Sequence, residues 1–447
     1  MKRLILSLTA LILSLTTLGQ QAGDKFVIKT TEAGKNAEWN LEGGDVFSDI
    51  SIIKHNGDKL ELFAKGYEDA GVWATYDINK IESITFSVFH KGDYQEESAA
   101  QAVKNMGLGT CFGNCLDAVD INKTMEKNSV TDFEKCWGQE PTTKPMVDFL
   151  KKNGFNSVRI AVTWFQHMKK DGTVDEAWMN RVQEVVDYVI DNGMYCILNV
   201  HHDTGADPTD KSYTHWIKAD LDNYNANKTK FEYLWTQIAN RFKNYDQHLV
   251  FEGYNEMLDA NNTWNAPKST NSYTALNKYA QSFVNAVRAT GGNNETRNLI
   301  VNTYAAACGD EVLNNLTIPT DKVIGHIAVE VHTYAPWDWF ATKGAWDGSC
   351  SNEIKSMFTR LNNKFISKGI PCIIGEYGTH GSKSVSKNST DSQKKAAADQ
   401  AADIVKQAKA YGVATFYWMS IFEGTDRTVP QWTLPTVVEA MQKAYKQ

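Results

Sequence analysis

Eight short apolar segments alternate with amphipathic segments along the chain after about residue 100. The amphipathic stretches, such as 177–193 and 272–291, carry apolar residues at helical spacing and end in a glycine. The apolar segments have the length of β-strands and cover residues 106–114, 157–164, 196–203, 249–256, 299–304, 327–334, 372–378 and 414–420. Eight strand–helix units match the length of a (β/α)8 barrel. We therefore predict the α/β class and a TIM barrel over residues 105–447. An open doubly wound sheet is the second choice, because no glycine-rich phosphate turn follows the first strand.

The chain before the barrel has a different pattern. Residues 24–90 contain short β-branched runs and the hairpin signal Asn56-Gly57, which predict a small β-rich module. Residues 91–104 are polar and are expected to form a linker. Residues 1–19 combine a charged start, an apolar run and small residues, as a signal peptide does. We expect cleavage of this segment and a secreted or periplasmic protein without a membrane anchor, because no later segment is apolar enough to cross a bilayer.

The net charge and the number of cysteines restrict the partners and the disulfides that this chain can have. The formal net charge of -7 argues against nucleic acid as a partner, since phosphates select basic surfaces. Seven cysteines is an odd number, so at least one thiol is unpaired or pairs between chains. In an oxidising compartment, one disulfide could form among the cysteines near predicted loops. These are Cys111, Cys115, Cys136, Cys308 and Cys350.

Polar and aromatic residues gather at the carboxyl ends of the predicted strands. They are Asn114, Arg159, Trp164, His201, His202, Asp203, Asn255, Glu256, His332, Tyr334, Glu376 and Trp418. Barrel enzymes place their active sites at this end of the strands. A purely structural barrel does not need polar groups at one end of an apolar cylinder, so we predict an active site there.

Two glutamates, Glu256 and Glu376, close the fourth and seventh strands. Two carboxylates across a barrel mouth suit glycoside hydrolysis, in which one protonates the leaving oxygen and the other attacks or activates water. Arg159 offers a fixed cation that would keep one carboxylate ionised, and Tyr334 offers a hydroxyl donor. Trp418 offers a flat face on which a sugar ring can stack.

Other acidic residues of the strands are expected to be structural. Glu252 and Glu330 lie inside their strands, and we expect them to pair within the barrel rather than to react. Asn255 and Glu256 would point to opposite faces of a regular strand. Both can serve one site only if the chain bends where the fourth strand ends.

Six segments, in order along the chain, resemble glycoside hydrolase family five, in the clan of retaining barrels with glutamates on strands four and seven. They are GFNSVRIAVTW, ILNVHHD, FEGYNE, VHTY, IIGEYG and FYWMS. The stretch EKCWGQEPTTKPMVDFLKKNGFNSVRI resembles the subgroup that acts on β-1,4-glucans and xyloglucan. The resemblance covers about residues 106–440. It implies a retaining, endo-acting β-1,4-glucanase of the cellulase kind, with a plant-type β-glycan such as cellulose-type glucan or xyloglucan as substrate.

The resemblance also implies roles for the residues at matching positions. Glu256 would be the general acid/base, and Glu376 would be the nucleophile of a double displacement. Asn255 would hold the 2-hydroxyl of the sugar under attack, a contact that tightens at the transition state. Arg159 and Tyr334 would orient Glu376.

The same resemblance implies a set of substrate contacts. His201 and His332 would line the subsite by hydrogen bonding, and Trp418 would be its stacking floor. Among the other tryptophans near strand ends, we select Trp137 and Trp337 as candidate glycan contacts because both lie beside motif residues.

Two departures from the family pattern leave the substrate open. Met257 follows the Asn-Glu pair where the family often has proline, and Thr110 and Cys111 replace a Trp-Asn pair on the first strand. Because first-strand residues flank the glycan cleft, mannan and mixed-linkage glucan stay as alternative substrates.

Two other classes of protein compete with this interpretation. A metal hydrolase could use His201, His202, Asp203 and His332. Adjacent histidines point apart in a strand, however, and a metal site would leave Glu256 without a role. A non-catalytic glycan-binding barrel would be expected to lack one of the two glutamates. We therefore predict an enzyme that needs no metal and no cofactor.

Overall fold

A computed structural model describes residues 25–30, 40–41, 44–47, 50–64, 68–87, 94–120, 126–206, 215–419 and 421–447. The chain divides into two compact units, Met1–Asp93 and Tyr94–Gln447. The predicted signal peptide, residues 1–19, lies outside the described residues, so its cleavage and the export of the protein stay predictions.

The first unit consists of two antiparallel sheets, as the β-rich pattern predicts. One sheet has the order β2-β3-β1-β7, and the other has the order β4-β5-β6. Two residues, Gly57 and Asp58, join β4 to β5, and the φ of Gly57 is 64°, the positive value that a tight hairpin turn requires. The predicted hairpin is confirmed, with its turn one residue later than Asn56-Gly57. The strands are β1 (Lys25–Thr30), β2 (Asn40–Leu41), β3 (Gly44–Phe47), β4 (Ile50–Asn56), β5 (Lys59–Ala64), β6 (Ala74–Asp77) and β7 (Ile81–Ser87).

The second unit contains a closed barrel of eight parallel strands. Their order around the barrel follows the chain, with β8 and β9 closing the ring between β15 and β10. All eight strands fall inside the segments predicted from the apolar pattern, apart from a one-residue extension at Tyr195, so the TIM barrel is confirmed. They are β8 (Leu108–Phe112), β9 (Ser157–Ile160), β10 (Tyr195–Asn199), β11 (Leu249–Glu252), β12 (Leu299–Asn302), β13 (Ile327–Thr333), β14 (Cys372–Tyr377) and β15 (Ala414–Tyr417).

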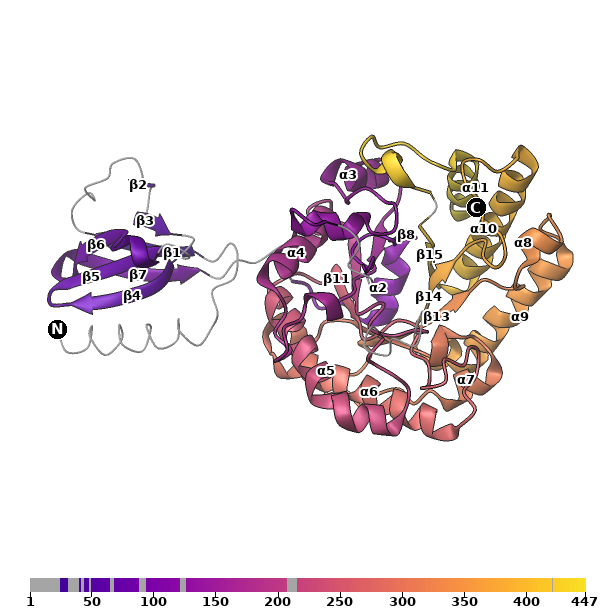
Figure 1. The fold of residues 1–447 in the computed structure, drawn as a ribbon, viewed down its shortest axis with the longest axis horizontal. Helices are drawn as coiled ribbons and strands as arrows, with labels where there is room; N and C mark the ends of the chain where they lie inside the picture. Colours follow the sequence, from indigo (N-terminus) through magenta and orange to yellow (C-terminus); the bar gives the residue numbers. More distant parts are fainter. Residues whose placement is uncertain are drawn as a thin grey trace. The chain divides into compact units, whose positions relative to one another are not determined.

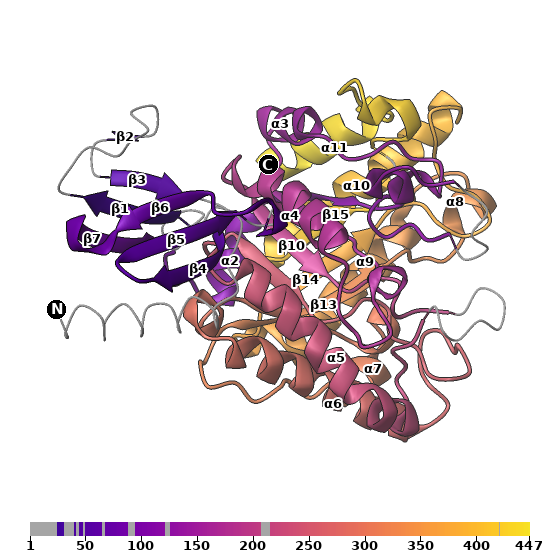
Figure 2. The ribbon, with the colours of Figure 1, turned by 60° about the vertical axis from the view of Figure 1, so that its left-hand side comes forward.

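Helices follow every barrel strand and form the outer layer (Figure 1). They are α3 (Lys144–Lys152), α4 (Glu176–Ile190), α5 (Leu221–Phe242), α6 (Thr270–Ala289), α7 (Asp310–Asn315), α8 (Trp339–Thr342), α9 (Gly348–Lys364), α10 (Asp391–Tyr411) and α11 (Pro435–Lys446). Both views show α5 and α6 side by side on the outside of the barrel (Figures 1 and 2). Short 3-10 helices occupy Glu68–Ala70, Ile78–Lys80, Val130–Lys135, Phe165–His167, Gly292–Glu295, Tyr304–Ala306, Ile366–Lys368 and Gly424–Arg427.

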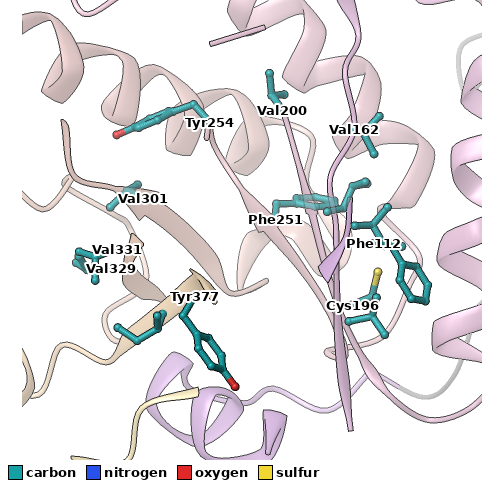
Figure 3. Close-up of a cluster of buried hydrophobic side chains, with 14 of the residues drawn as sticks. Phe112, Val162, Cys196, Val200, Phe251, Tyr254, Val301, Val329, Val331 and Tyr377 are labelled. Atoms are coloured by element: carbon teal, nitrogen blue, oxygen red, sulfur yellow. The ribbon is translucent and has the colours of Figure 1, made fainter. Parts of the chain in front are cut away.

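The main hydrophobic core lies between the strands and the helices. Outward-facing strand residues such as Phe251, Val301 and Val329 pack there with residues from the helices (Figure 3). Trp235 of α5 is fully buried against Phe251, with ring centroids 5.7 Å apart. Because both faces of each strand are covered, the strands read as continuous apolar runs, which is why the sequence pattern located them well.

The interior of the barrel has a second, smaller core. It contains Tyr195, Ile197, Val250, Ile300, Ala328, Ile373, Ala414 and Phe416 from the strands. Helix α2 (Ala99–Met106) packs Ala99, Ala102, Val103 and Met106 against these residues. Its first amide, that of Ala99, donates to the carbonyl of Gly325, which precedes β13. Helix α2 therefore closes the barrel at the amino ends of the strands, opposite the end where the polar residues gather.

The prediction of a linker over residues 91–104 is wrong for its second half. Residues 99–104 belong to α2, whose N-terminus is capped by Ser98, because its hydroxyl oxygen accepts a hydrogen bond from the amide of Gln101. The apolar residues of α2 recur at i, i+3, i+4 and i+7, a spacing that a polar-looking segment hides when it is read by composition alone.

Two further properties concern the described residues as a whole. None of the described helices has both the length and the hydropathy needed to span a membrane. All seven cysteines carry free thiols, including the five considered for a disulfide. Cys111, Cys115, Cys196, Cys350 and Cys372 are buried, so they act mainly as small core residues.

Replacing Met106 of α2 by alanine should lower the free energy of unfolding by about 2–5 kcal/mol, because a fully buried side chain is removed from the barrel interior. The exposed neighbour Lys104 provides the control, and Lys104→Ala should change it by less than about 0.5 kcal/mol. Urea denaturation of the two variants measures both values. Equal stability of the two variants would show that α2 is not part of the core.

Candidate active site

Arg159 on β9 lies at the centre of the polar end of the barrel. Its guanidinium is fully buried, and its Nε and Nη2 donate to the two oxygens of Glu252 at 2.7 and 2.8 Å. Nε also lies 3.1 Å from Oε1 of Glu330. Nη1 donates to Glu376 at 2.9 Å, and Nη2 donates to the side-chain oxygen of Asn255 at 2.8 Å. One cation thus connects strands β9, β11, β13 and β14.

The burial of Arg159 has electrostatic consequences for its partners. Burial disfavours the guanidinium, but the carboxylates, first that of Glu252, outweigh it and hold the pKa of Arg159 well above its usual range. Burial raises the pKa of Glu252, and Arg159 opposes that rise. Glu252 and Glu330 each pair with Arg159 inside the barrel, which agrees with the expectation that these two residues are structural.

A β-bulge brings Glu376 into the site. Val331 of β13 pairs with Ile374 of β14, but the next residue, His332, pairs with Glu376. Gly375 is therefore an extra residue on β14. A side chain at Gly375 has no room, because a Cβ atom there would lie 1.7 Å from Oε1 of Glu330. The bulge thus depends on a glycine packed directly against a buried carboxylate.

Two hydrogen bonds orient the carboxylate of Glu376. Arg159 donates to Oε1 at 2.9 Å, and the hydroxyl of Tyr334 donates to Oε2 at 2.7 Å. Burial, followed by the charge of Glu376, raises the pKa of Tyr334, so its hydroxyl stays protonated and able to donate. The predicted contacts of Arg159 and Tyr334 with Glu376 are therefore present.

The chain bends before Asn255 and Glu256, as their common use in one site requires. Strand β11 ends at Glu252, earlier than the sequence pattern predicted, and the amide of Asn255 donates to the carbonyl of Val200 at 2.9 Å. The side chain of Asn255 reaches Arg159, while that of Glu256 reaches His332. The two neighbours thus contribute to the same site.

His332 connects three carboxylates. Its Nδ1 lies 2.8 Å from Oε1 of Glu256 and 3.7 Å from Oε2 of Glu376, and its Nε2 lies 3.2 Å from Oε1 of Glu330. Burial opposes the charged ring, but the three carboxylates, first that of Glu376, outweigh burial and raise the pKa of His332 to about 10. His332 is therefore a second buried cation beside Arg159.

Glu256 and Glu376 face each other in space although they are far apart in the chain. Glu256, Glu376 and His332 each bring one ligand atom within 4.8 Å of those of the others. The Glu256 side chain is 21% exposed, whereas that of Glu376 is 5% exposed. The two carboxylates therefore have unlike surroundings, one reaching solvent and one enclosed by donors.

His201 and Trp418 form an adjoining wall. Their rings are stacked, with centroids 5.6 Å apart and planes 8° apart. Nε2 of His201 lies 3.9 Å from Glu376, and burial holds the pKa of His201 well below its usual range, so the ring is neutral. Trp418 packs on Gly113, where a Cβ atom would lie 2.6 Å from the indole ring.

The two outlying tryptophans lie outside the hydrogen-bonded cluster. Trp137 is 38% exposed and donates its indole N–H to the carbonyl of Val119. The centroid of its ring lies 5.1 Å from that of His202. Trp337 is 67% exposed and lies edge-on to His380, also at 5.1 Å. Both present accessible aromatic surface, and their contact with a glycan stays a prediction.

Two groups among the described residues bring potential metal ligands together, but they differ from the set considered in the sequence. Asp117, His201 and His202 form one, and Glu256, His332 and Glu376 form the other. Asp203, which the metal hypothesis requires, instead accepts hydrogen bonds from the amide of Trp164 and the indole of Trp216. Asp203 is therefore structural, which weakens the metal hypothesis as it was formulated.

Sequence reasoning missed part of the polar layer below the strand tips. Asn199 donates to Glu252 and to Nδ1 of His201, and Asn302 also donates to Glu252. The missed signal is the period of two in a strand, because Asn199 precedes His201 by two positions and so shares its face.

Comparison with known proteins identifies the family. The family model described as Cellulase (glycosyl hydrolase family 5) matches residues 120–424. The chain belongs to glycosyl hydrolase family 5. It is therefore a glycoside hydrolase of the cellulase type, which confirms the predicted family and enzyme class and argues against a non-catalytic glycan-binding barrel.

Curated relatives of the family 5 chain are similar over most of its length. It is 34% identical over 360 residues to Endoglucanase B of Neocallimastix patriciarum, covering 78% of this chain and 70% of that protein. It is 32% identical over 376 residues to Endoglucanase A of Ruminococcus albus, covering 80% of this chain and 95% of that protein.

Solved structures give a closer match. PbGH5A, a glycoside hydrolase family 5 enzyme from Prevotella bryantii B14, is 58% identical with a TM-score of 0.76, covering 79% of this chain and 100% of that chain. The same similarity holds for a mutant of that enzyme in complex with a xyloglucan tetradecasaccharide. A broad-specificity endoglucanase from an uncultured bacterium is 45% identical with a TM-score of 0.72, covering 79% of this chain and 97% of that chain.

The residues that depart from the family pattern are buried rather than on the surface of the site. Thr110, Cys111 and Met257 are all buried. Cys111 donates its thiol to the carbonyl of Gly375 at 3.1 Å, directly beneath Glu376. Thr110 and Cys111 therefore do not flank the cleft as expected, and Cys111 supports the β-bulge instead.

Replacing Gly375 by alanine should lower the free energy of unfolding by about 1–3 kcal/mol, because its Cβ atom would displace Glu330 from Arg159 and His332. Gly309→Ala is the matched control, since nothing lies within 4 Å of a Cβ atom at that position. Thermal and urea denaturation compare the two variants. A Gly375→Ala protein as stable as the control would show that the bulge does not depend on this close contact.

Proposed function

We propose that this protein is a retaining, endo-acting β-1,4-glucanase that cleaves its substrate by double displacement. Glu376 is the nucleophile and forms the glycosyl-enzyme intermediate. Glu256 is the general acid that protonates the leaving oxygen, and it then activates water as a general base. The observation that carries this proposal is the close approach of the two carboxylates, with an oxygen of each within 4.8 Å of the other.

The separation of the two carboxylates supports retention over inversion. Retaining enzymes hold their carboxyl groups roughly 5–5.5 Å apart, whereas inverting enzymes leave roughly 6.5–9.5 Å for a water molecule. An oxygen of Glu256 and an oxygen of Glu376 lie within 4.8 Å of each other, which agrees with the shorter class. Direct attack by Glu376 therefore fits the site better than activation of a water placed between the two groups.

The surroundings of each carboxylate support the assignment of roles. Glu376 accepts from Arg159 and Tyr334, which orient an oxygen for attack and stabilise negative charge. Glu256 reaches solvent and lies at the open side of the site, where a leaving group must depart. Arg159 holds the side-chain oxygen of Asn255, and the side-chain nitrogen, 3.4 Å from Nε2 of His201, is the atom that would donate to the 2-hydroxyl.

The aromatic wall supports a sugar substrate. The indole of Trp418 is partly exposed and is fixed in orientation by His201 and Gly113. A fixed aromatic face stacks well against the apolar face of a pyranose ring. Trp137 and Trp337 could extend such contacts along a polymer, which endo-action requires.

Within the β-1,4-glucans, we favour xyloglucan and cellulose-type glucan as substrates. The sequence identity of 58% to an enzyme solved with a xyloglucan tetradecasaccharide supports the first, and relatives named endoglucanases support the second. Mixed-linkage glucan and mannan are the alternatives, and a lichenase from Caldicellulosiruptor sp. F32 that is 31% identical to this chain supports the first of them.

Removal of either glutamate should separate the two roles. Glu376→Ala should lower kcat/KM by at least ~10³-fold on every substrate, because no covalent intermediate can form. Glu256→Ala should lose ~10²–10⁴-fold on polysaccharide but far less on dinitrophenyl cellobioside, whose leaving group needs no proton. Added azide should then accelerate turnover of that aryl glycoside by Glu256→Ala and yield the β-glycosyl azide.

A variant of an exposed glutamate, Glu353→Ala, controls for nonspecific effects and should retain full activity. Circular dichroism confirms the folding of each variant. Near-normal hydrolysis by Glu376→Ala would overturn the assignment of the nucleophile, and equal loss on both substrates by Glu256→Ala would overturn that of the acid.

Product analysis tests the stereochemistry and the substrate class. Proton NMR of the first products should show the β-anomer, as double displacement requires, and an initial α-anomer would contradict the mechanism. On carboxymethylcellulose, xyloglucan, barley glucan, glucomannan and galactomannan, we expect the highest kcat/KM on xyloglucan or carboxymethylcellulose, with oligosaccharides of several sizes. Fastest cleavage of galactomannan would replace the proposed substrate with mannan.

A further inference from the structure

Glu330 is a buried carboxylate for which double displacement has no direct use. Its side chain is 0% exposed and lies on β13, two positions before His332. Oε1 lies 3.1 Å from Nε of Arg159 and 3.2 Å from Nε2 of His332. The other oxygen, Oε2, is buried without a hydrogen-bond partner among the described residues. Burying a carboxylate with one oxygen unpartnered is unfavourable, so the interactions of the other oxygen, Oε1, have to compensate for that cost.

The bound oxygen of Glu330 determines where the protons of His332 lie. A neutral imidazole has one N–H group and one lone pair, and a lone pair facing a carboxylate oxygen is repulsive. Arg159 holds the carboxylate of Glu330 in place and cannot accept a proton from it. Nε2 of His332 must therefore carry a hydrogen that points toward Glu330. The proton on Nδ1 is then the second one on the ring, and it points at Glu256, 2.8 Å away.

We propose that Glu330 is a positioning residue for the acid/base carboxyl: it keeps both nitrogens of His332 protonated, so that Nδ1 donates to Oε1 of Glu256. This hydrogen bond occupies one oxygen of Glu256 and leaves the other, Oε2, for the leaving group of the substrate. The inference rests on the proposed function only in taking Glu256 as the acid/base. It explains why a buried carboxylate with one unpartnered oxygen is present at this depth of the barrel.

The charged groups around His332 agree with a doubly protonated ring. They are Glu330 on its own strand, Glu376 on β14, Glu252 and Glu256 on and after β11, Arg159 on β9 and His201 after β10. Arg159 and the neutral His201 do not add a negative charge, but the four carboxylates outnumber the one guanidinium. Burial alone would favour the neutral ring, yet the net effect raises the pKa of His332 to about 10.

The packing at Gly375 shows that the position of Glu330 is built into the fold. Only a glycine leaves room for Oε1 of Glu330 at this point of β14, and the next residue is Glu376. The same bulge therefore orients the nucleophile and admits the carboxylate that acts on His332. This arrangement couples the two catalytic glutamates through one small space inside the barrel.

The direct test is the protonation of His332, observed by nitrogen-15 NMR of histidine-labelled enzyme, with His332→Gln used to assign its signals. In the wild-type enzyme both ring nitrogens should be protonated and show no titration between pH 5 and 8. In Glu330→Gln the raised pKa should fall by at least ~1 pH unit, because a charged acceptor is removed. The ring then loses its Nδ1 proton at a lower pH than in the wild-type enzyme.

Glu252→Gln is the matched control, because Glu252 is equally buried and bound to Arg159 but makes no hydrogen bond to His332. It should shift the His332 titration by much less than Glu330→Gln does. A single-proton neutral His332 in the wild-type enzyme at pH 7 would overturn the proposal, even if no variant folds. Equal shifts in the two variants would also overturn it, since any buried carboxylate would then have the same effect.

Kinetics provide a second readout that a purely structural role would not produce. Above the lowered pKa of His332, Glu330→Gln should lose kcat about 10-fold on cellobiosides with poor leaving groups, with KM little changed. On dinitrophenyl cellobioside its kcat/KM should stay within ~2-fold of wild type, because kcat/KM reports the first step and that leaving group needs no acid. Equal losses on both substrates would contradict an action through Glu256.

The two proposals fail in different experiments. If Glu256 is not the acid/base, Glu256→Ala shows no dependence on the leaving group, while the NMR titration still measures the effect of Glu330 on His332. If Glu330 does not control His332, the titration is unchanged in Glu330→Gln, while Glu256→Ala and Glu376→Ala still behave as expected for a retaining enzyme.

Discussion

The ion pairs of Arg159 inside the barrel are the interaction on which the site depends. One guanidinium contacts Glu252, Glu330 and Glu376 and the amide of Asn255, and it thereby joins four strands. Removing one partner from a buried ion pair typically costs about 3–5 kcal/mol, because the remaining charge is left uncompensated. The catalytic geometry and the stability of the upper barrel are therefore determined by the same contacts.

The depth at which this charged layer lies follows from the two cores. Below it, the barrel interior is apolar and is closed by α2 at the amino ends of the strands. Outside it, the strands pack against the helices through a large hydrophobic core (Figure 3). The two cores keep water away from the layer on these sides, so its electrostatic interactions are strong, while the Glu256 side chain is 21% exposed. A rigid, dry floor beneath one open carboxyl is well suited to the proposed roles of one glutamate as nucleophile and the other as acid.

Much of the site could be predicted because strand ends of a barrel converge regardless of their distance in the sequence. Arg159, His201, His332, Tyr334, Glu376 and Trp418 all come from strand ends or the residues just after them, and the structure brings them together. The residues that were missed or misjudged lie one layer deeper or in segments with mixed composition. Asn199 and Asn302 carry no charge, and the first residues of α2 lie in a segment whose polar composition predicts a linker.

The sequence by itself determined the barrel, the family and the identity of the two glutamates, because these depend on residue types at a regular spacing. Only the tertiary structure decided how the glutamates differ. The bend after Glu252 places the side chains of Asn255 and Glu256 in the same site. The bulge at Gly375 directs Glu376 toward Arg159. Both depend on contacts between residues that are more than 40 positions apart, such as Glu330 with Gly375 and His332 with Glu256. No local pattern specifies such contacts, because they arise only when the strands have closed around them.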